Sequence, residues 1–153
     1  MTASLVRTSA GSTISICAAT LPATYDLTGF AALTYTLINE ISDLGAFGKK
    51  YNLVTFMPLG SRQVIKRRGS YNNGSMSLKM GQSVTDAGQL ALATGLASDT
   101  SSSFKVVTQS GSTYYFTAQI LSTVTTIGTV DVITEQSVDL ELDNSVVLGA
   151  QIA

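Results

Sequence analysis

The stretch Glu135-Gln136-Ser137-Val138-Asp139-Leu140-Glu141-Leu142-Asp143 alternates apolar and polar residues with a period of two. Its apolar residues, with Val132 before them, share one face, and its carboxylates share the other. Successive side chains of a strand point to opposite faces, so this alternation predicts a half-buried strand with an acidic outer face. The sequence therefore predicts a sheet that packs one face against a hydrophobic core and leaves the other face exposed.

Similar alternation along most of the chain predicts a mainly β protein. In 75–80, Met76, Leu78 and Met80 alternate with Ser75, Ser77 and Lys79. Other expected strands are 13–19, which places Cys17 in the core, 33–41, with Leu33, Tyr35, Leu37 and Ile41 on its apolar face, 51–57, 104–108 and 113–121. The last two strands flank Ser110-Gly111, which predicts a hairpin turn.

One segment, 85–97, departs from the β pattern. It is rich in Ala and Leu and has Asp86 in its first turn, which predicts a short helix capped by Ser83 or Thr85. Two alternative pairs of residues are expected to pack it on the sheet: Leu92 with Leu96, or Leu90 with Ala91.

The stretch 43–73 is rich in glycine and carries basic side chains on both faces of 62–68. A strand with charges on both faces cannot be central in a core, because a buried unpaired charge is costly. We therefore expect a projecting arm, and a loop of this length usually has a function or a partner.

Charge is distributed unevenly along the chain, although its net value is only −1. Seven of the nine basic residues lie within 49–79, and five acids but no base follow Lys105. If these regions lie at different ends of the molecule, copies associate head to tail and form rings or filaments. Alternatively, the two regions pair within one molecule or are simply solvated.

Composition excludes several functions. The absence of His and the single cysteine, Cys17, remove His-based catalysis, disulfide frameworks and Cys-based metal sites. Ser102 and Lys105 match an S-x-x-K spacing by chance, since the partner motifs of Ser–Lys enzymes are missing. We expect no enzyme, cofactor or metal, and no secretory signal or membrane span. A cation site on the acidic stripe is a weaker alternative.

An ordered series of segments resembles the tail tube (major tail) proteins of long-tailed bacteriophages with non-contractile tails. The segments are 45–59, 64–74, 86–89 and 115–117, followed by the closing acidic strand, within 36–144. The resemblance implies a β-sandwich or open barrel of two packed antiparallel sheets, with one short flanking α-helix and a projecting arm, in one domain over 1–153.

The resemblance also implies a function. Six copies form a ring, and rings stack into a tube through which double-stranded DNA passes without specific binding. Tape-measure, tail-tip and tail-terminator proteins are the implied partners. The protein would be made in the bacterial cytoplasm and located in the virion tail. The alternatives are a tube subunit of a contractile tail or secretion machine and, from another class, a monomeric β-sandwich binding module.

The resemblance assigns roles to particular residues. The arm is expected to contact an adjacent ring through Phe47, Lys49, Lys50, Tyr51, Phe56, Met57, Arg62, Lys66, Arg67 and Arg68. The residues expected to line the lumen, or to complement the basic arm, are Glu40, Asp139, Glu141 and Asp143. The terminal segments 1–20 and 146–153 are further candidates for contacts between rings.

Overall fold

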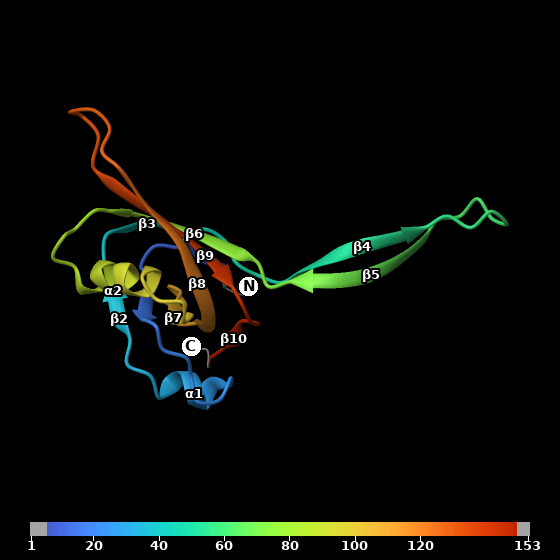
Figure 1. Cartoon of the computed structure of the whole chain (residues 1–153), viewed down its shortest axis with the longest axis horizontal. Helices are drawn as coiled ribbons and strands as arrows, with labels where there is room; N and C mark the ends of the chain where they lie inside the picture. Colours follow the sequence, from blue (N-terminus) through green and yellow to red (C-terminus); the bar gives the residue numbers. More distant parts are fainter. Residues whose placement is uncertain (1–5, 150–153) are drawn as a thin grey trace, which may run out of the picture.

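The computed structural model describes residues 6–149. Within this range most elements are strands (Figure 1). The elements are β1 (Thr13–Cys17), α1 (Leu27–Ala31), β2 (Thr36–Ile38), β3 (Ile41–Asp43), β4 (Lys50–Phe56), β5 (Ile65–Asn72), β6 (Ser75–Gly81), α2 (Ala87–Leu96), β7 (Ser102–Val107), β8 (Thr113–Thr126), β9 (Glu135–Leu142) and β10 (Val147–Leu148).

The main sheet is antiparallel and curls into an open barrel. Its strand order is β2-β1-β7-β8-β9-β6-β3, and β10 pairs with β8. The edge strands β2 and β3 are separated in sequence only by Asn39 and Glu40, so the two edges of the sheet must approach each other. Glu40 adopts a positive φ of 60°, and its carbonyl accepts a hydrogen bond from the Gly81 amide at 2.9 Å. This corner divides the predicted strand 33–41. In β2, Ile38 is the cross-strand partner of the buried Ile14 and points inward, so Leu37 points outward, contrary to the predicted face.

The apolar faces of the curled sheet enclose one core. Phe104 and Phe116 are fully buried and stack with ring centroids 5.4 Å apart. Alternation in β6 and β9 follows the prediction, since Met76, Leu78, Met80, Val138, Leu140 and Leu142 are buried. Val132 is an exception, because it lies in the turn between β8 and β9, before β9 begins, and is exposed.

Helix α2 stabilises the corner that closes the barrel. Its N-cap is Asp86 rather than the predicted Ser83 or Thr85, and the carboxylate accepts the Gln89 amide at 3.0 Å. The same carboxylate accepts the Asn39 side-chain amide at 2.6 Å, so helix and corner share one hydrogen-bonded group. Gln89 donates to the Gly81 carbonyl at 2.9 Å. Leu92 and Ala91 pack against the core, one from each predicted pair.

The mainly β class, the antiparallel sheets, the flanking helix and the arm are confirmed, with one difference in arrangement. The second sheet, β4-β5, is the arm itself, and both walls around the core come from the single curled sheet. Figure 1 shows the arm extending far from the barrel, and the β8–β9 hairpin rising from another side. The short helix α1, which buries Phe30, was not predicted.

Both terminal segments contribute strands to the barrel. β1 lies between β2 and β7 and places Ile14 and Ile16 in the core, while Cys17 is half-buried on the opposite face, which corrects its predicted core position. β10 pairs with the start of β8. Residues 1–5 and 150–153 of the predicted contact segments lie outside the described range. Within 6–149, neither α1 nor α2 has the length and apolarity that a membrane span requires.

Candidate assembly surfaces

The arm leaves the barrel where two glycines meet. Gly74 has a φ of +97°, and a Cβ at this position would lie 2.5 Å from the Gly48 carbonyl oxygen. Only glycine allows this backbone conformation together with so close an approach. Just beyond, Lys50 and Asn72 are cross-strand partners, so the two ends of the arm are adjacent.

Within the arm, basic and apolar side chains alternate across the ladder. Leu53 pairs with Arg68, and Val54 pairs with Arg67. Paired residues share a face, so each face of the hairpin carries both cations and apolar groups. Phe56 pairs with Ile65 at the far end, next to the 57–64 loop. Neither face of the arm is therefore purely apolar or purely polar, and both are exposed.

Ring contacts organise the base of the arm. Tyr51 and Tyr71 lie with centroids 5.3 Å apart. The Arg68 guanidinium carbon lies 4.1 Å from the Tyr51 centroid, and the Lys49 ammonium lies 4.4 Å from the Tyr71 centroid. Exposed cation–π contacts contribute about 0.5–1 kcal/mol each, which orients the hairpin but does not replace a core.

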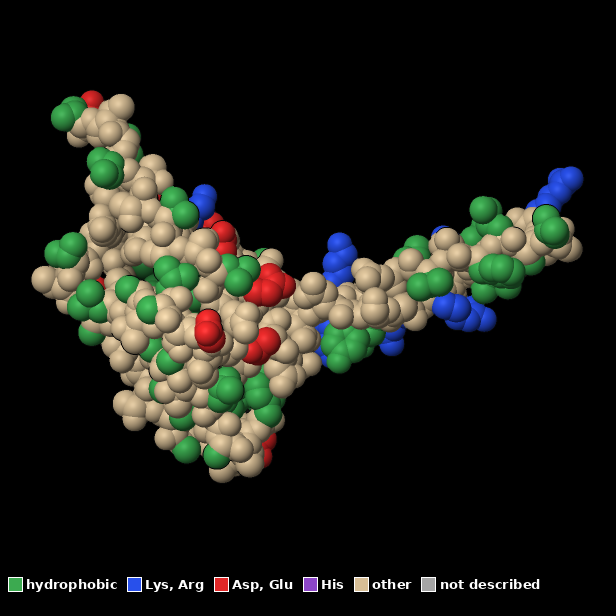
Figure 2. All heavy atoms as spheres, viewed as in Figure 1, with side chains coloured by type: hydrophobic (Ala, Val, Ile, Leu, Met, Phe, Trp, Pro, Cys, Tyr) green, Lys and Arg blue, Asp and Glu red, His purple; other side chains and the backbone are tan. Residues whose placement is uncertain are grey.

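Within residues 6–149, no surface of the chain covers the arm. Met57 is 77% exposed and Phe56 is 63% exposed. Among residues 6–149, no Lys or Arg of the arm forms an ion pair with a carboxylate. Figure 2 shows the basic side chains spread along the arm and acidic ones gathered on the barrel near its base. Among the described residues, the basic arm therefore does not pair with the acidic region of the same molecule.

The structure places most predicted arm residues on this hairpin, with one correction. Tyr51, Phe56, Lys66, Arg67, Arg68 and Lys50 lie on its strands, Met57 and Arg62 in its end loop, and Lys49 at its base. Phe47 lies before the arm and packs on the barrel, with its ring centroid 5.4 Å from Tyr114 and 5.7 Å from Phe116. Its apolar side chain completes this chain's own core, so it is not an arm residue.

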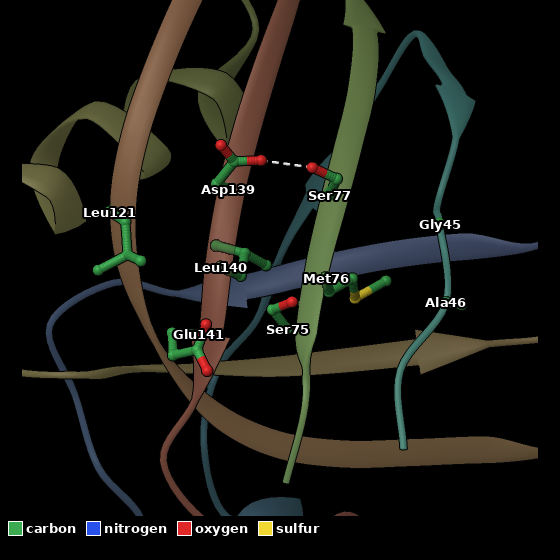
Figure 3. A pocket seen from close by; sticks show the side chains of 9 residues that line it. All are labelled: Gly45, Ala46, Ser75, Met76, Ser77, Leu121, Asp139, Leu140 and Glu141. Atoms are coloured by element: carbon green, nitrogen blue, oxygen red, sulfur yellow. Dashed lines mark hydrogen bonds between the residues drawn. The ribbon is translucent and has the colours of Figure 1, made fainter. Parts of the chain in front are cut away.

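Asp139 and Glu141 form an acidic face on the outside of β9, between β6 and β8 (Figure 3). Asp139 accepts hydrogen bonds from the hydroxyls of Ser77 and Ser122, the latter at 3.0 Å. These two hydrogen bonds hold the pKa of the Asp139 carboxyl below its ordinary range. A hollow of about 430 Å³ lies against this face, bordered on one side by Gly45 and Ala46. The face is anionic and rich in hydroxyl groups.

Glu40 lies apart from this acidic face, whereas Asp143 lies at the end of it. Glu40 lies at the closing corner beside Gly81, four residues along β6 from Ser77, which is about 13 Å of strand. Asp143 follows the end of β9, and its carboxylate accepts hydrogen bonds from Ser101 and Thr117. Of the predicted acidic residues, Glu40 is therefore separate, and Asp139, Glu141 and Asp143 follow one face of β9 and its continuation.

A second exposed apolar feature was missed from the sequence. The β8–β9 tip, residues 127–133, projects beyond the sheet (Figure 1) and exposes Ile127, Val130, Val132 and Ile133. Its turn is defined by a hydrogen bond from the Val132 amide to the Thr129 carbonyl at 3.1 Å and by a φ of +73° at Gly128. Gly128 within an apolar and β-branched run was the available signal for a hairpin turn.

Neither a protein-family model nor a curated protein sequence matches this chain. Solved structures do. One, described as the extracellular contractile injection system PVC sheath/tube terminator, is 10% identical with a TM-score of 0.65 and covers 97% of this chain and 100% of its own. The SPP1 tail tube is 16% identical with a TM-score of 0.61, covering 93% of this chain and 78% of its own.

A chain from the anti-feeding prophage (AFP) baseplate structure is 11% identical with a TM-score of 0.65, covering 98% of both chains. The fold is thus one found in phage tail tubes and in contractile injection systems. This likeness confirms the predicted resemblance to tail-tube proteins at the level of the fold, and these neighbours are components of structural assemblies.

Proposed function

We propose that this chain is a structural subunit of a phage tail tube, in which six copies form a ring and rings stack around a central bore. The observation that carries the proposal is the arm: a long two-stranded hairpin with exposed apolar and basic side chains on both faces. An isolated hairpin of this kind is marginally stable in water, so a partner surface explains its existence. The shared fold with the SPP1 tail tube makes a second copy the natural partner.

In this assembly the acidic face lines the bore. DNA is bound by basic surfaces through release of counterions, so a conduit for DNA should present neutral or negative groups. Asp139 and Glu141, with hydroxyls from Ser75, Ser77 and Ser122 around them, provide such a wall. Double-stranded DNA would slide past this wall without specific binding.

The arm is proposed to reach an adjacent ring. Its end loop and outer strands would bury Phe56 and Met57 on the neighbouring subunit, while Arg62, Lys66, Arg67 and Arg68 meet acidic or carbonyl groups there. Tape-measure, tail-tip and tail-terminator proteins are the further partners, and the virion tail is the location.

A second candidate, the tube of a contractile injection machine, is favoured by a specific observation. One of the similar solved structures described above comes from a contractile injection system. Such a tube needs an outer surface that fits a sheath. Tubes that form from this chain alone and bind a contractile sheath protein would support this candidate over the non-contractile one.

An arm deletion tests the proposal. Because Lys50 and Asn72 are direct cross-strand partners, two glycines can replace Lys50–Asn72 without stretching the barrel. We expect the full chain to form rings or tubes with a central hole in negative-stain electron microscopy, and the deletion variant to remain a folded monomer. A matched control replaces 108–112, the β7–β8 turn, with an unrelated turn of the same length and keeps the arm.

Two results would contradict the proposal. The full chain would remain monomeric at high concentration, or the arm-deleted variant would form the same tubes as the full chain. Circular dichroism and the free energy of unfolding establish that the deletion variant is folded, so loss of assembly cannot be attributed to loss of the barrel.

A further inference from the structure

The β8–β9 tip and a groove near the arm base are two unpartnered apolar features at opposite ends of the same strand. The groove, which we call the Phe47 groove, has a volume of about 340 Å³ and is lined mainly by Phe47, Tyr114, Val146 and Leu148, with Lys49 at its border. Tyr114 is at the start of β8, and the tip follows its end at Thr126. Twelve residues of strand separate them, roughly 40 Å along the chain.

The groove is a preformed apolar cleft. The rings of Phe47 and Tyr114 meet edge to face at 5.4 Å, and β10 holds Leu148 beside Tyr114 through the β10–β8 ladder. The Gly149 amide donates to the Thr113 carbonyl at 2.7 Å and secures the end of β10. These contacts fix the walls before any ligand arrives, so binding in the groove requires little rearrangement.

The tip is also preformed, and its exposure needs an explanation. The turn at 129–132 places Val130 at its summit with 98% of its surface exposed, and Ile133 is 77% exposed. Burying aliphatic groups away from water lowers the free energy, and a hairpin turn is normally built from polar residues. The exposed apolar tip therefore indicates a protein surface that buries it.

The charges on the tip and at the Phe47 groove are complementary. Asp131, beside Val130 in the turn, is the acid of the tip, and Lys49 is the cation at the border of the Phe47 groove. An apolar tip with one carboxylate complements an apolar groove with one ammonium. Because the two features lie at opposite ends of β8, the tip cannot enter the groove of its own chain.

We propose that the β8–β9 tip of one copy inserts into the Phe47 groove of the next copy. The contact is heterologous, so it repeats along the direction of β8 and forms an open line of copies rather than a closed dimer. The inference rests on the proposed function, in which this line runs along the tube and gives a second contact between rings, separate from the arm.

Cysteine cross-linking tests the contact directly. In a Cys17→Ser background, the chain carries Val130→Cys at the tip and Val146→Cys in the groove. Oxidation of assembled tubes should give a ladder of covalent multimers on a non-reducing gel, because every copy carries both ends. The matched control pairs Val146→Cys with Leu90→Cys, which is exposed on α2 and is not part of the tip, and should give no ladder.

A pair of substitutions provides a second measurement. Val130→Ser with Ile133→Ser should raise the protein concentration needed for assembly by about tenfold or more, since two aliphatic groups no longer leave water. Val84→Ser with Leu90→Ser removes comparable exposed apolar surface elsewhere and should leave that concentration unchanged. Asp131→Lys and Lys49→Asp should each weaken assembly, and the double variant should restore it.

The outcomes separate this inference from the proposed function. A chain that stays monomeric overturns both proposals. Tubes without a tip-to-groove ladder overturn this inference alone. A ladder that appears only with Leu59→Cys from the arm end loop assigns the groove to a neighbouring arm. A ladder that appears only after truncation beyond Gly149 assigns the groove to this chain's own segment 150–153, and it too overturns the inference.

Discussion

The arm and the barrel use the same antiparallel ladder but differ in what covers their faces. In β6 and β9 every second side chain is buried in a common core, whereas β4 and β5 leave both faces in solvent apart from partial cover at Gly69. Hydrogen bonds alone contribute little net stability, because water also satisfies them in the unfolded chain. The barrel is therefore stabilised by its own residues, whereas the arm has no comparable cover within 6–149, and we propose that another molecule supplies it.

Two matched phenylalanine substitutions test this difference most strongly. Phe116→Ala should lower the free energy of unfolding by about 3–5 kcal/mol, because it leaves a cavity beside Phe104 and Phe47. Phe56→Ala on the arm should change it by less than about 0.5 kcal/mol. Urea denaturation of both variants measures the two effects. Equal destabilisation would mean that the arm packs on its own barrel.

Asp86→Ala tests the corner that closes the barrel and should cost about 2 kcal/mol. The substitution removes the N-cap of α2 and leaves the side chain of Asn39 without its carboxylate partner. Asp86→Asn keeps a capping oxygen and should lose less. A variant as stable as the unchanged chain would show that helix and corner are not coupled through this carboxylate.

The same carboxylate makes barrel stability depend on pH. Burial opposes ionisation of Asp86, but hydrogen bonds from Asn39 and Gln89 outweigh it and hold the pKa below its ordinary value of 3.8. The stabilisation is complete above that ordinary value and is lost as pH falls through the lowered pKa of the folded chain. Asp86→Asn should make the free energy of unfolding fall less steeply at acidic pH. An unchanged dependence on pH would mean that other carboxylates cause it.

Charge reversal of the arm should leave the barrel intact and weaken assembly. Changing Lys66, Arg67 and Arg68 to Glu should raise the concentration needed for assembly about tenfold at low salt, or about 1.4 kcal/mol. Added salt screens exposed contacts, so it should reduce the difference from the unchanged chain. Sedimentation at several ionic strengths measures both. If the increase in the concentration needed for assembly does not depend on salt, the arm contacts its neighbour through the apolar side chains Phe56 and Met57 instead.

Tyr71→Ala should have the smallest effect on the free energy of unfolding, below about 0.5 kcal/mol. It removes a ring contact with Tyr51 and a cation–π contact with Lys49, both exposed. Hydrogen exchange of the arm amides should nevertheless accelerate, because these contacts order the hairpin base. A large loss of global stability would show that the arm and the barrel unfold together.

Local alternation predicted much of this structure because burial in a sheet has a period of two. It identified Met76, Leu78, Met80, Val138, Leu140 and Leu142 as inward-facing, and the turn at Ser110-Gly111 is present between β7 and β8. It failed in the expected strand 33–41, which the positive φ of Glu40 interrupts. The register with β1 pairs Ile38 with the buried Ile14, so Ile38 rather than Leu37 faces the core.

The assembly surfaces were only partly predictable for the same reason. Unpaired basic residues on both faces of a strand indicated the arm before its geometry was known. Phe47 was assigned to the arm because sequence proximity cannot reveal its contact with Tyr114 and Phe116, more than 60 residues away in the chain. The Phe47 groove and the β8–β9 tip depend on strand order, which periodicity does not specify.

A cryo-electron microscopy map of particles assembled from the purified full chain is the most direct measurement of the central claim. The proposed tube would appear as stacked sixfold rings with Asp139 and Glu141 facing the bore and β4–β5 lying across a subunit of the next ring. Particles in which these carboxylates face outward and the hairpin rests on its own barrel would contradict it.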